Sequence, residues 1–125
     1  MAAPARSTVS GVVLAAGVSR RFGGGTPKQL LEVEGEPLVR RAVARALQAS
    51  FLEVIVVVGH RAADVRSILE GLPARIVENR AHAEGQSTSV TTGLRCVDPV
   101  ASAATFIPCD QPFLTAAVLD AVIAA

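Results

Sequence analysis

The sequence predicts an α/β fold in which helices pack on a mainly parallel sheet. Short apolar segments rich in β-branched residues alternate along the chain with helical patterns, as they do in βαβ units. These segments are hydrophobic throughout rather than at every second residue, which indicates strands buried on both faces. The chain has 4 Phe and no Trp or Tyr, so its core must consist of aliphatic side chains, as is typical of parallel sheets covered by helices.

Four strands follow from the apolar segments, each bounded by polar or turn-forming residues. They are expected at Ser10–Ala15, Glu53–Val58, Ala74–Glu78 and Ala104–Pro108.

The first predicted helix opens at Pro37, a residue that suits the start of a helix. Its apolar residues share one face, and Arg40, Arg41 and Arg45 share the other. We interpret these arginines as a solvated helix face rather than a nucleic-acid surface. Three more helices are expected over Ala62–Leu69, over Gln86–Cys96 and from the N-cap Thr115 onward.

Length and charge exclude several classes of protein. The 125 residues, half of them hydrophobic, suit one domain with one core. A net charge of +1 argues against a basic nucleic-acid binder, and no apolar run reaches the ~18 residues of a membrane span. The two cysteines, Cys96 and Cys109, lack metal-ligand spacing and fit a reducing cytoplasm. We therefore expect a cytoplasmic protein whose partners include neither nucleic acid nor membrane.

The loop after the first strand, residues 14–28, carries the positive charge of the N-terminal quarter. It holds Arg20, Arg21 and Lys28, the only lysine, and no acidic residue precedes Glu32. The loop is glycine-rich but matches neither the Rossmann nor the Walker fingerprint. Glycines that expose backbone N–H groups, together with these cations, favour a polyanion such as a triphosphate. The alternatives are a flexible glycine hinge and a solvated surface lysine.

Asp110 follows the fourth predicted strand directly. A carboxylate at the end of a buried strand is costly unless it is paired or binds a cation. If the fourth strand lies beside the first, Asp110 faces the glycine-rich loop, where Mg²⁺ would bridge it to phosphates. The alternative is a turn or capping Asp before Pro112.

Polar residues also follow the third predicted strand. Asn79 and the segment Gly85–Ser89 at a helix start offer amide, hydroxyl and backbone N–H groups that suit a nucleobase or a ribose. Helix capping alone would explain Ser87. We interpret His60 and His82 as ordinary polar residues, because neither has a partner pattern for catalysis.

Together these motifs resemble the MobA-like nucleotidyltransferases, and most closely the molybdenum cofactor cytidylyltransferase branch. The resemblance extends from about Val12 to the end of the chain. It rests on Leu14-Ala15-Ala16-Gly17-x-Ser19-x-Arg21-Phe22-Gly23, Pro27-Lys28-Gln29-Leu30-Leu31, Gly85-Gln86-Ser87-x-Ser89, Gly93-Leu94 and Cys109-Asp110-Gln111-Pro112.

The resemblance implies a Rossmann-like, three-layer α/β/α fold of the nucleotidyltransferase type. It also implies Mg²⁺-dependent transfer of CMP, or another NMP, from an NTP to a phosphorylated acceptor such as molybdopterin, with release of pyrophosphate. The implied catalytic residues are Arg21, Lys28 and the metal ligand Asp110. The implied nucleotide-binding residues are Leu14, Ala15, Ala16, Gly17, Ser19, Arg20, Arg21, Lys28, Asn79, Gly85, Ser87 and Ser89.

The choice of CTP rests on Ala16, because guanylyl-transferring relatives have Gly at this position and the extra methyl group would narrow the base site. The triplet Pro27-Lys28-Gln29 is also similar to isoprenoid-pathway cytidylyltransferases, although those read His-Asp-Ala-Ala-Arg-Pro around the metal carboxylate. Sugar-phosphate nucleotidyltransferases are a more distant alternative.

Members of the resembled family continue beyond this length and add a second metal-binding carboxylate, for which Asp98 and Asp120 are poor substitutes. Because of this difference in length, we expect residues 9–125 to be the nucleotide-binding part of one truncated domain. We also expect residues 1–8 to form a flexible N-terminus. A short, non-catalytic nucleotide-binding module is the alternative. A molybdoenzyme or a second copy of the chain is a further expected partner.

Overall fold

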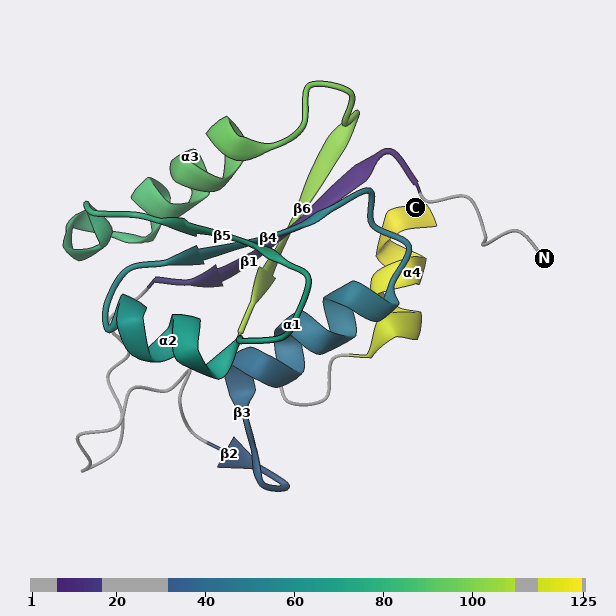
Figure 1. The fold of residues 1–125 in the computed structure, drawn as a ribbon. Coiled ribbons are helices and arrows are strands. Elements are labelled where there is room, and N and C mark those ends of the chain that lie inside the picture. Colours follow the sequence, from purple (N-terminus) through teal and green to yellow (C-terminus); the bar gives the residue numbers. More distant parts are fainter. Residues whose placement is uncertain (1–6, 17–31, 110–114, 125) are drawn as a thin grey trace.

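A four-stranded parallel sheet forms the centre of the computed structural model, which describes residues 7–16, 32–109 and 115–124. Its strand order is β5-β4-β1-β6 (Figure 1). The chain runs outward from β1 to β4 and β5 and then returns to β6 on the other side of β1. The strands are β1 (Val9–Ala15), β4 (Val54–Val58), β5 (Arg75–Glu78) and β6 (Ala103–Pro108).

Helices cover both faces of this sheet. Figure 1 shows α3 (Gln86–Cys96) on one face, and α1 (Leu38–Gln48), α2 (Ala62–Ile68) and α4 (Ala116–Ala124) on the other. The arrangement confirms the expected Rossmann-like three-layer fold. None of the helices within the described ranges is long and apolar enough to cross a membrane.

Two hydrophobic clusters, one on each face of the sheet, make up the core. Val13 and Val56 belong to the cluster that includes α1 residues, whereas Val12 and Val57 belong to the cluster on the α3 face. Successive strand residues therefore bury opposite faces, which explains why all of β4 is buried and why its sequence is apolar without alternation.

Two short elements lie outside the predicted set. Strands β2 (Glu32–Val33) and β3 (Glu36–Pro37) form a small antiparallel hairpin ahead of α1. Its turn residues have φ values of 55° at Glu34 and 81° at Gly35, as a two-residue hairpin turn of positive φ requires. The second element is the 3₁₀ turn η2 (His82–Glu84).

The prediction of a solvated arginine face on α1 is wrong for Arg40 and Arg41. Arg40 Nη1 donates a hydrogen bond to the Ile68 carbonyl oxygen of α2 at 2.7 Å. The Arg41 side chain is only 15% exposed and lies 3.6 Å from a Glu34 carboxylate oxygen and 3.9 Å from one of Glu36. The end of α2 and the hairpin pack along α1, so these arginines join parts of the fold.

The chain before β1 is tied to neighbouring loops. The Ser7 backbone N–H donates to the Ser50 carbonyl oxygen at 2.9 Å, and the Thr8 and Ser102 hydroxyl oxygens lie 2.6 Å apart. Both contacts lie at the amino end of the sheet, away from the strand ends that open ligand sites in parallel sheets.

Candidate functional site

The carboxyl ends of β1, β4 and β6 meet where the strand order reverses. Leu14 pairs with Val57 of β4 on one side and with Pro108 of β6 on the other. Ligands of open α/β sheets bind at such a position. The last strand, β6, lies beside the first, β1, which is the condition on which the predicted role of Asp110 depends. Asp110 therefore follows a strand that pairs directly with β1.

Part of the predicted site lies outside the described residues. These predicted residues are Gly17, Ser19, Arg20, Arg21, Lys28 and Asp110. The structure describes the strand ends from which their segments leave, together with Leu14, Ala15, Ala16, Asn79, Gly85, Ser87 and Ser89.

The end of β1 is buried and hydrogen-bonded just before the glycine-rich segment begins. Ala15 and Ala16 are each 1% exposed. The Ala16 carbonyl oxygen accepts a hydrogen bond from the His60 backbone N–H at 3.0 Å, and Ala16 belongs to the cluster of Val12 and Ile55. The Ala16 methyl group is thus part of the core, and its predicted effect on the base site stays a prediction.

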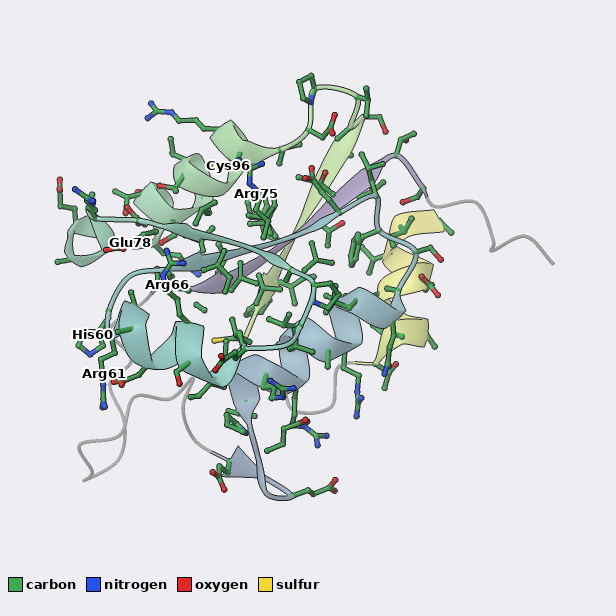
Figure 2. The ribbon with its side chains drawn as sticks, viewed as in Figure 1. His60, Arg61, Arg66, Arg75, Glu78 and Cys96 are labelled. Carbon is green, nitrogen blue, oxygen red and sulfur yellow. The ribbon has the colours of Figure 1, made fainter. Side chains whose placement is uncertain are left out.

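His60 and Arg61 follow β4 at the same edge of the sheet. Figure 2 shows both at the start of α2. Arg61 has a left-handed backbone, with φ 56°, and its Nε lies 2.7 Å from the Asp64 carboxylate. No sequence pattern indicates the backbone contact of His60, because any residue except proline supplies an N–H.

Asn79 directly follows β5 and is 3% exposed. Its Nδ2 donates to Thr88 Oγ1 at 2.8 Å and to Ser89 Oγ at 2.9 Å. Its Oδ1 accepts the Ala81 backbone N–H at 3.0 Å, and its own N–H donates to the Val58 carbonyl oxygen at 2.7 Å. The structure thus joins two predicted site residues, Asn79 and Ser89. It adds Thr88, which lies in the selected segment Gly85–Ser89 but is not among the predicted nucleotide-binding residues.

Gly85, the residue before α3, lies close to Asn79, because the Thr88 hydroxyl contacts both residues. Gly85 is the N-cap, with φ 122°, and offers no side chain to cap the helix. Backbone N–H groups in the first turn of a helix lack partners within the helix and suit polar or anionic ligands. Ser87 is exposed in this turn, whereas Ser89 is 4% exposed and faces Asn79. The two serines therefore differ in their surroundings: Ser87 is open to solvent, whereas Ser89 forms a buried hydrogen bond within the fold.

A shallow pocket of about 260 Å³ lies between one flank of α3 and the loop after β5. Asn79 and Ala81 line it from the loop, and Thr91, Thr92 and Arg95 are among the residues that line it from the helix. The Thr92 hydroxyl donates to the Thr88 carbonyl oxygen at 2.8 Å. The pocket therefore has hydroxyl, amide and guanidinium groups around it.

Asp98 and Asp120 make contacts that maintain the fold. Asp98 Oδ1 accepts the Val100 backbone N–H at 2.9 Å within a turn. Asp120 Oδ1 accepts the Ser50 backbone N–H at 2.8 Å, which links α4 to the loop after α1. The expectation that neither carboxylate replaces a second metal ligand stays a prediction.

The chain belongs to the MobA-like NTP transferase family, because a family model for the MobA-like NTP transferase domain matches residues 11–125. The resemblance seen in the motifs is therefore confirmed, and with it the nucleotidyltransferase class.

Two curated relatives show how far the similarity extends. The bifunctional IPC transferase and DIPP synthase of Rubrobacter xylanophilus is 43% identical over 95 residues, which cover 72% of this chain and 22% of that protein. The 2-C-methyl-D-erythritol 4-phosphate cytidylyltransferase of Symbiobacterium thermophilum is 34% identical over 119 residues, covering 94% of this chain and 49% of that protein. The chain spans no more than about half of either relative.

Solved structures agree with the fold. A nucleotidyl transferase from Methanothermobacter thermautotroptrophicus superposes with a TM-score of 0.84 at 30% identity, covering 93% of this chain and 56% of that one. The manganese complex of the Mycobacterium tuberculosis protein Rv0371C has a TM-score of 0.74 at 31% identity, with 93% and 58% covered. Both similarities extend over nearly the whole of this chain.

Proposed function

We propose that this chain is the nucleotide-binding part of an enzyme that transfers a nucleotidyl group, preferably CMP from CTP, to a phosphorylated small molecule. An acceptor phosphate oxygen forms a bond to the α-phosphorus of the NTP. The bond from that phosphorus to the bridging oxygen breaks, and pyrophosphate leaves. Molybdopterin is the acceptor that we favour, on the basis of the motifs around Ala16 and Asp110.

One observation carries this proposal: β6 pairs with β1 up to Leu14 and Pro108. The segments that follow these two residues contain the cationic glycine-rich loop and Asp110. In-line phosphoryl chemistry needs reactants held in place and negative charge neutralised, rather than a covalent catalyst. Cations after one strand and a carboxylate after its neighbour are the groups such a reaction needs.

The cationic loop would bind the phosphates, with Arg21 and Lys28 as the charged contacts and the backbone from Leu14 to Gly17 along the nucleotide. The start of α3, with Gly85 and Ser87, would lie at the base or ribose. Support comes from the buried, hydrogen-bonded end of β1 and from the uncapped start of α3.

Asp110 would hold a divalent metal ion, which we propose to be Mg²⁺. A carboxylate is the hard oxygen ligand that Mg²⁺ prefers, usually together with substrate phosphates and water. The metal would neutralise charge on the NTP, and the manganese complex of a related protein supports a divalent ion in this family. Cytoplasmic location follows from the substrates proposed.

The deciding experiment is release of pyrophosphate from CTP and Mg²⁺ with molybdopterin as acceptor. A longer form of the protein, if the gene continues past Ala125, is assayed beside the 125-residue chain. Release that depends on the acceptor supports the proposal. Tight CTP binding without release by either form, whatever the acceptor, would instead favour a non-catalytic nucleotide-binding module.

A second candidate acceptor is 2-C-methyl-D-erythritol 4-phosphate. The 34% identity to the Symbiobacterium cytidylyltransferase over 94% of this chain favours it, as does the triplet Pro27-Lys28-Gln29. The same assay separates the two acceptors, because only the true one should raise the rate of pyrophosphate release.

Lys28→Ala tests the phosphate-binding role. The variant should bind CTP at least about tenfold more weakly, because a charge-assisted contact to phosphate contributes roughly 1.5–3 kcal/mol. Isothermal titration measures the affinity, and thermal unfolding checks the fold. Arg66→Ala, at an exposed position of α2, is the matched control for loss of one positive charge. Equal affinities for the wild type and Lys28→Ala would remove Lys28 from the site.

A further inference from the structure

We infer that Asn79 is a positioning residue, which holds the start of α3 at the nucleotide site and does not itself contact the base. The inference rests on the proposed function and refines the role predicted for Asn79. It depends on a set of hydrogen bonds that we name the Asn79 network. The network consists of Asn79, Ala81, Gly85, Thr88 and Ser89.

The amide of Asn79 has no donor left for a ligand. An asparagine amide carries two N–H donors and one carbonyl oxygen. One donor goes to Thr88 Oγ1 at 2.8 Å and the other to Ser89 Oγ at 2.9 Å. The carbonyl oxygen accepts the Ala81 backbone N–H at 3.0 Å, which fixes the orientation of the amide. A base could accept a hydrogen bond from the Asn79 amide group only if one of these internal hydrogen bonds broke.

Thr88 continues the network to the N-cap of α3. Its Oγ1 lies 2.7 Å from the Gly85 carbonyl oxygen and 3.1 Å from that of Ala81, and it has one proton to donate. The Thr88 backbone N–H also donates to Gly85 at 3.2 Å. Gly85 lacks a capping side chain, so the start of α3 is held by the contacts of the network with the Gly85 carbonyl oxygen rather than by a side-chain cap.

The network also links α3 to the centre of the sheet. The Asn79 N–H donates to the Val58 carbonyl oxygen at 2.7 Å, and Val58 pairs with Ala15 at the end of β1. With Asn79 3% exposed and Ser89 4% exposed, these bonds are shielded from water, and losing one leaves a buried polar group unpaired. Buried contacts thus set the position of the start of α3 relative to the end of β1.

The test compares CTP affinity in Asn79→Ala, Thr88→Val and the double variant of the 125-residue chain. Each single variant should bind CTP about 3- to 10-fold more weakly, which corresponds to loss of one hydrogen bond. The double variant should be little worse than either, because both changes break one network. The rate of amide hydrogen exchange over residues 80–88 of the ligand-free protein should rise in all three variants.

Two matched variants of threonine make the test specific. Thr88→Ser keeps the hydroxyl group and should retain CTP affinity to within about twofold. Thr8→Val removes a hydroxyl at the amino end of the sheet, where it lies 2.6 Å from that of Ser102, and should leave affinity unchanged. The Thr88 pair keeps the test decisive even if Asn79→Ala does not fold.

Two results would overturn the inference. The first is weaker CTP binding in Asn79→Ala with unchanged affinity in Thr88→Val, which would indicate direct contact between Asn79 and the nucleotide. The second is unchanged amide exchange over residues 80–88, which would deny the positioning role whether or not a nucleotide binds. Failure of the wild-type chain to bind any nucleoside triphosphate would instead contradict the proposed function.

Discussion

Glu53 joins three segments at the amino end of the sheet, opposite the candidate site. Its Oε2 accepts the Ser10 hydroxyl at 2.6 Å and the Asp98 backbone N–H at 2.7 Å. Ser10 is fully buried within β1, so its hydroxyl group depends on this single carboxylate oxygen. The side chain of Glu53, the residue before β4, therefore connects β1 to the loop before β6.

Glu53→Ala should lower the free energy of unfolding by about 1–3 kcal/mol, because it leaves the buried Ser10 hydroxyl without this acceptor. Glu53→Gln should lose less, since its amide oxygen can still accept. Urea denaturation of both variants measures the difference. Glu70→Ala, at an exposed glutamate, is the control and should stay within about 0.5 kcal/mol of wild type. Equal stability of Glu53→Ala and wild type would contradict the role assigned to Glu53.

At the residue scale, the sequence predicts where polar groups stand but not what they contact. Asn79 could be selected because it follows an apolar strand, and Ser89 because it opens a helix. The bond between them depends on how α3 crosses the sheet, and no local pattern encodes that. The same limit applies to the ion pairs of Arg41. Its acidic partners, Glu34 and Glu36, belong to a hairpin whose strands have only two residues each.

Helix α3 approaches the sheet closely at Gly93. A Cβ atom added there would lie 2.6 Å from Val12 Cγ1 and 3.4 Å from Val57 Cγ2. Two buried β-branched side chains therefore occupy the space that a side chain at position 93 would need. The Gly93-Leu94 motif in the sequence thus has a packing reason, since glycine lets α3 lie close to β1 and β4.

Gly93→Ala should destabilise the protein by roughly 1–3 kcal/mol through overpacking, although alanine favours a helix over glycine by about 1 kcal/mol. Thermal and urea unfolding measure the loss. Val12→Ala frees the space, so Gly93→Ala should cost less in that background than in wild type. Thr91→Ala, at an exposed position of the same helix, is the control. A Gly93→Ala variant more stable than wild type would contradict the packing argument.

At the element scale, the expected strands and helices of the main sheet agree with the structure to within a residue or two at their ends. This agreement has a physical cause: strands buried on both faces require unbroken apolar runs, and β4 is such a run. Two-residue strands such as β2 and β3 leave no periodicity to detect. The 3₁₀ turn η2 is equally short, so the sequence offered no signal for any of the three.

At the scale of the whole molecule, the two ends of the sheet carry different groups of contacts, and the proposed nucleotide site lies at the carboxyl end. The amino end carries the contacts of Glu53, Ser7 and Thr8. The carboxyl end carries the Asn79 network and the strand ends beside Leu14. Because the two ends are separated by the length of the strands, changes at one end should add to changes at the other.

The proposed binding of CTP with Mg²⁺ at the carboxyl end should raise the stability of the whole chain, because a ligand that binds only the folded protein shifts the unfolding equilibrium. At a free concentration one hundred times its Kd, the ligand should add about 2.7 kcal/mol to the free energy of unfolding. Urea denaturation with and without CTP measures this increment, and chelation of the metal with EDTA should remove most of it, since the metal is proposed to join the phosphates to the protein.

Asp110→Asn separates metal binding from phosphate binding within the same measurement. An amide is a weaker ligand for Mg²⁺ than a carboxylate, so the variant should lose the part of the increment that EDTA removes from wild type. The part due to the cationic loop should remain, and Lys28→Ala should reduce that part instead. If Asp110→Asn kept the full Mg²⁺-dependent increment, the metal would have to bind elsewhere, and the pairing of β6 with β1 would no longer explain the site.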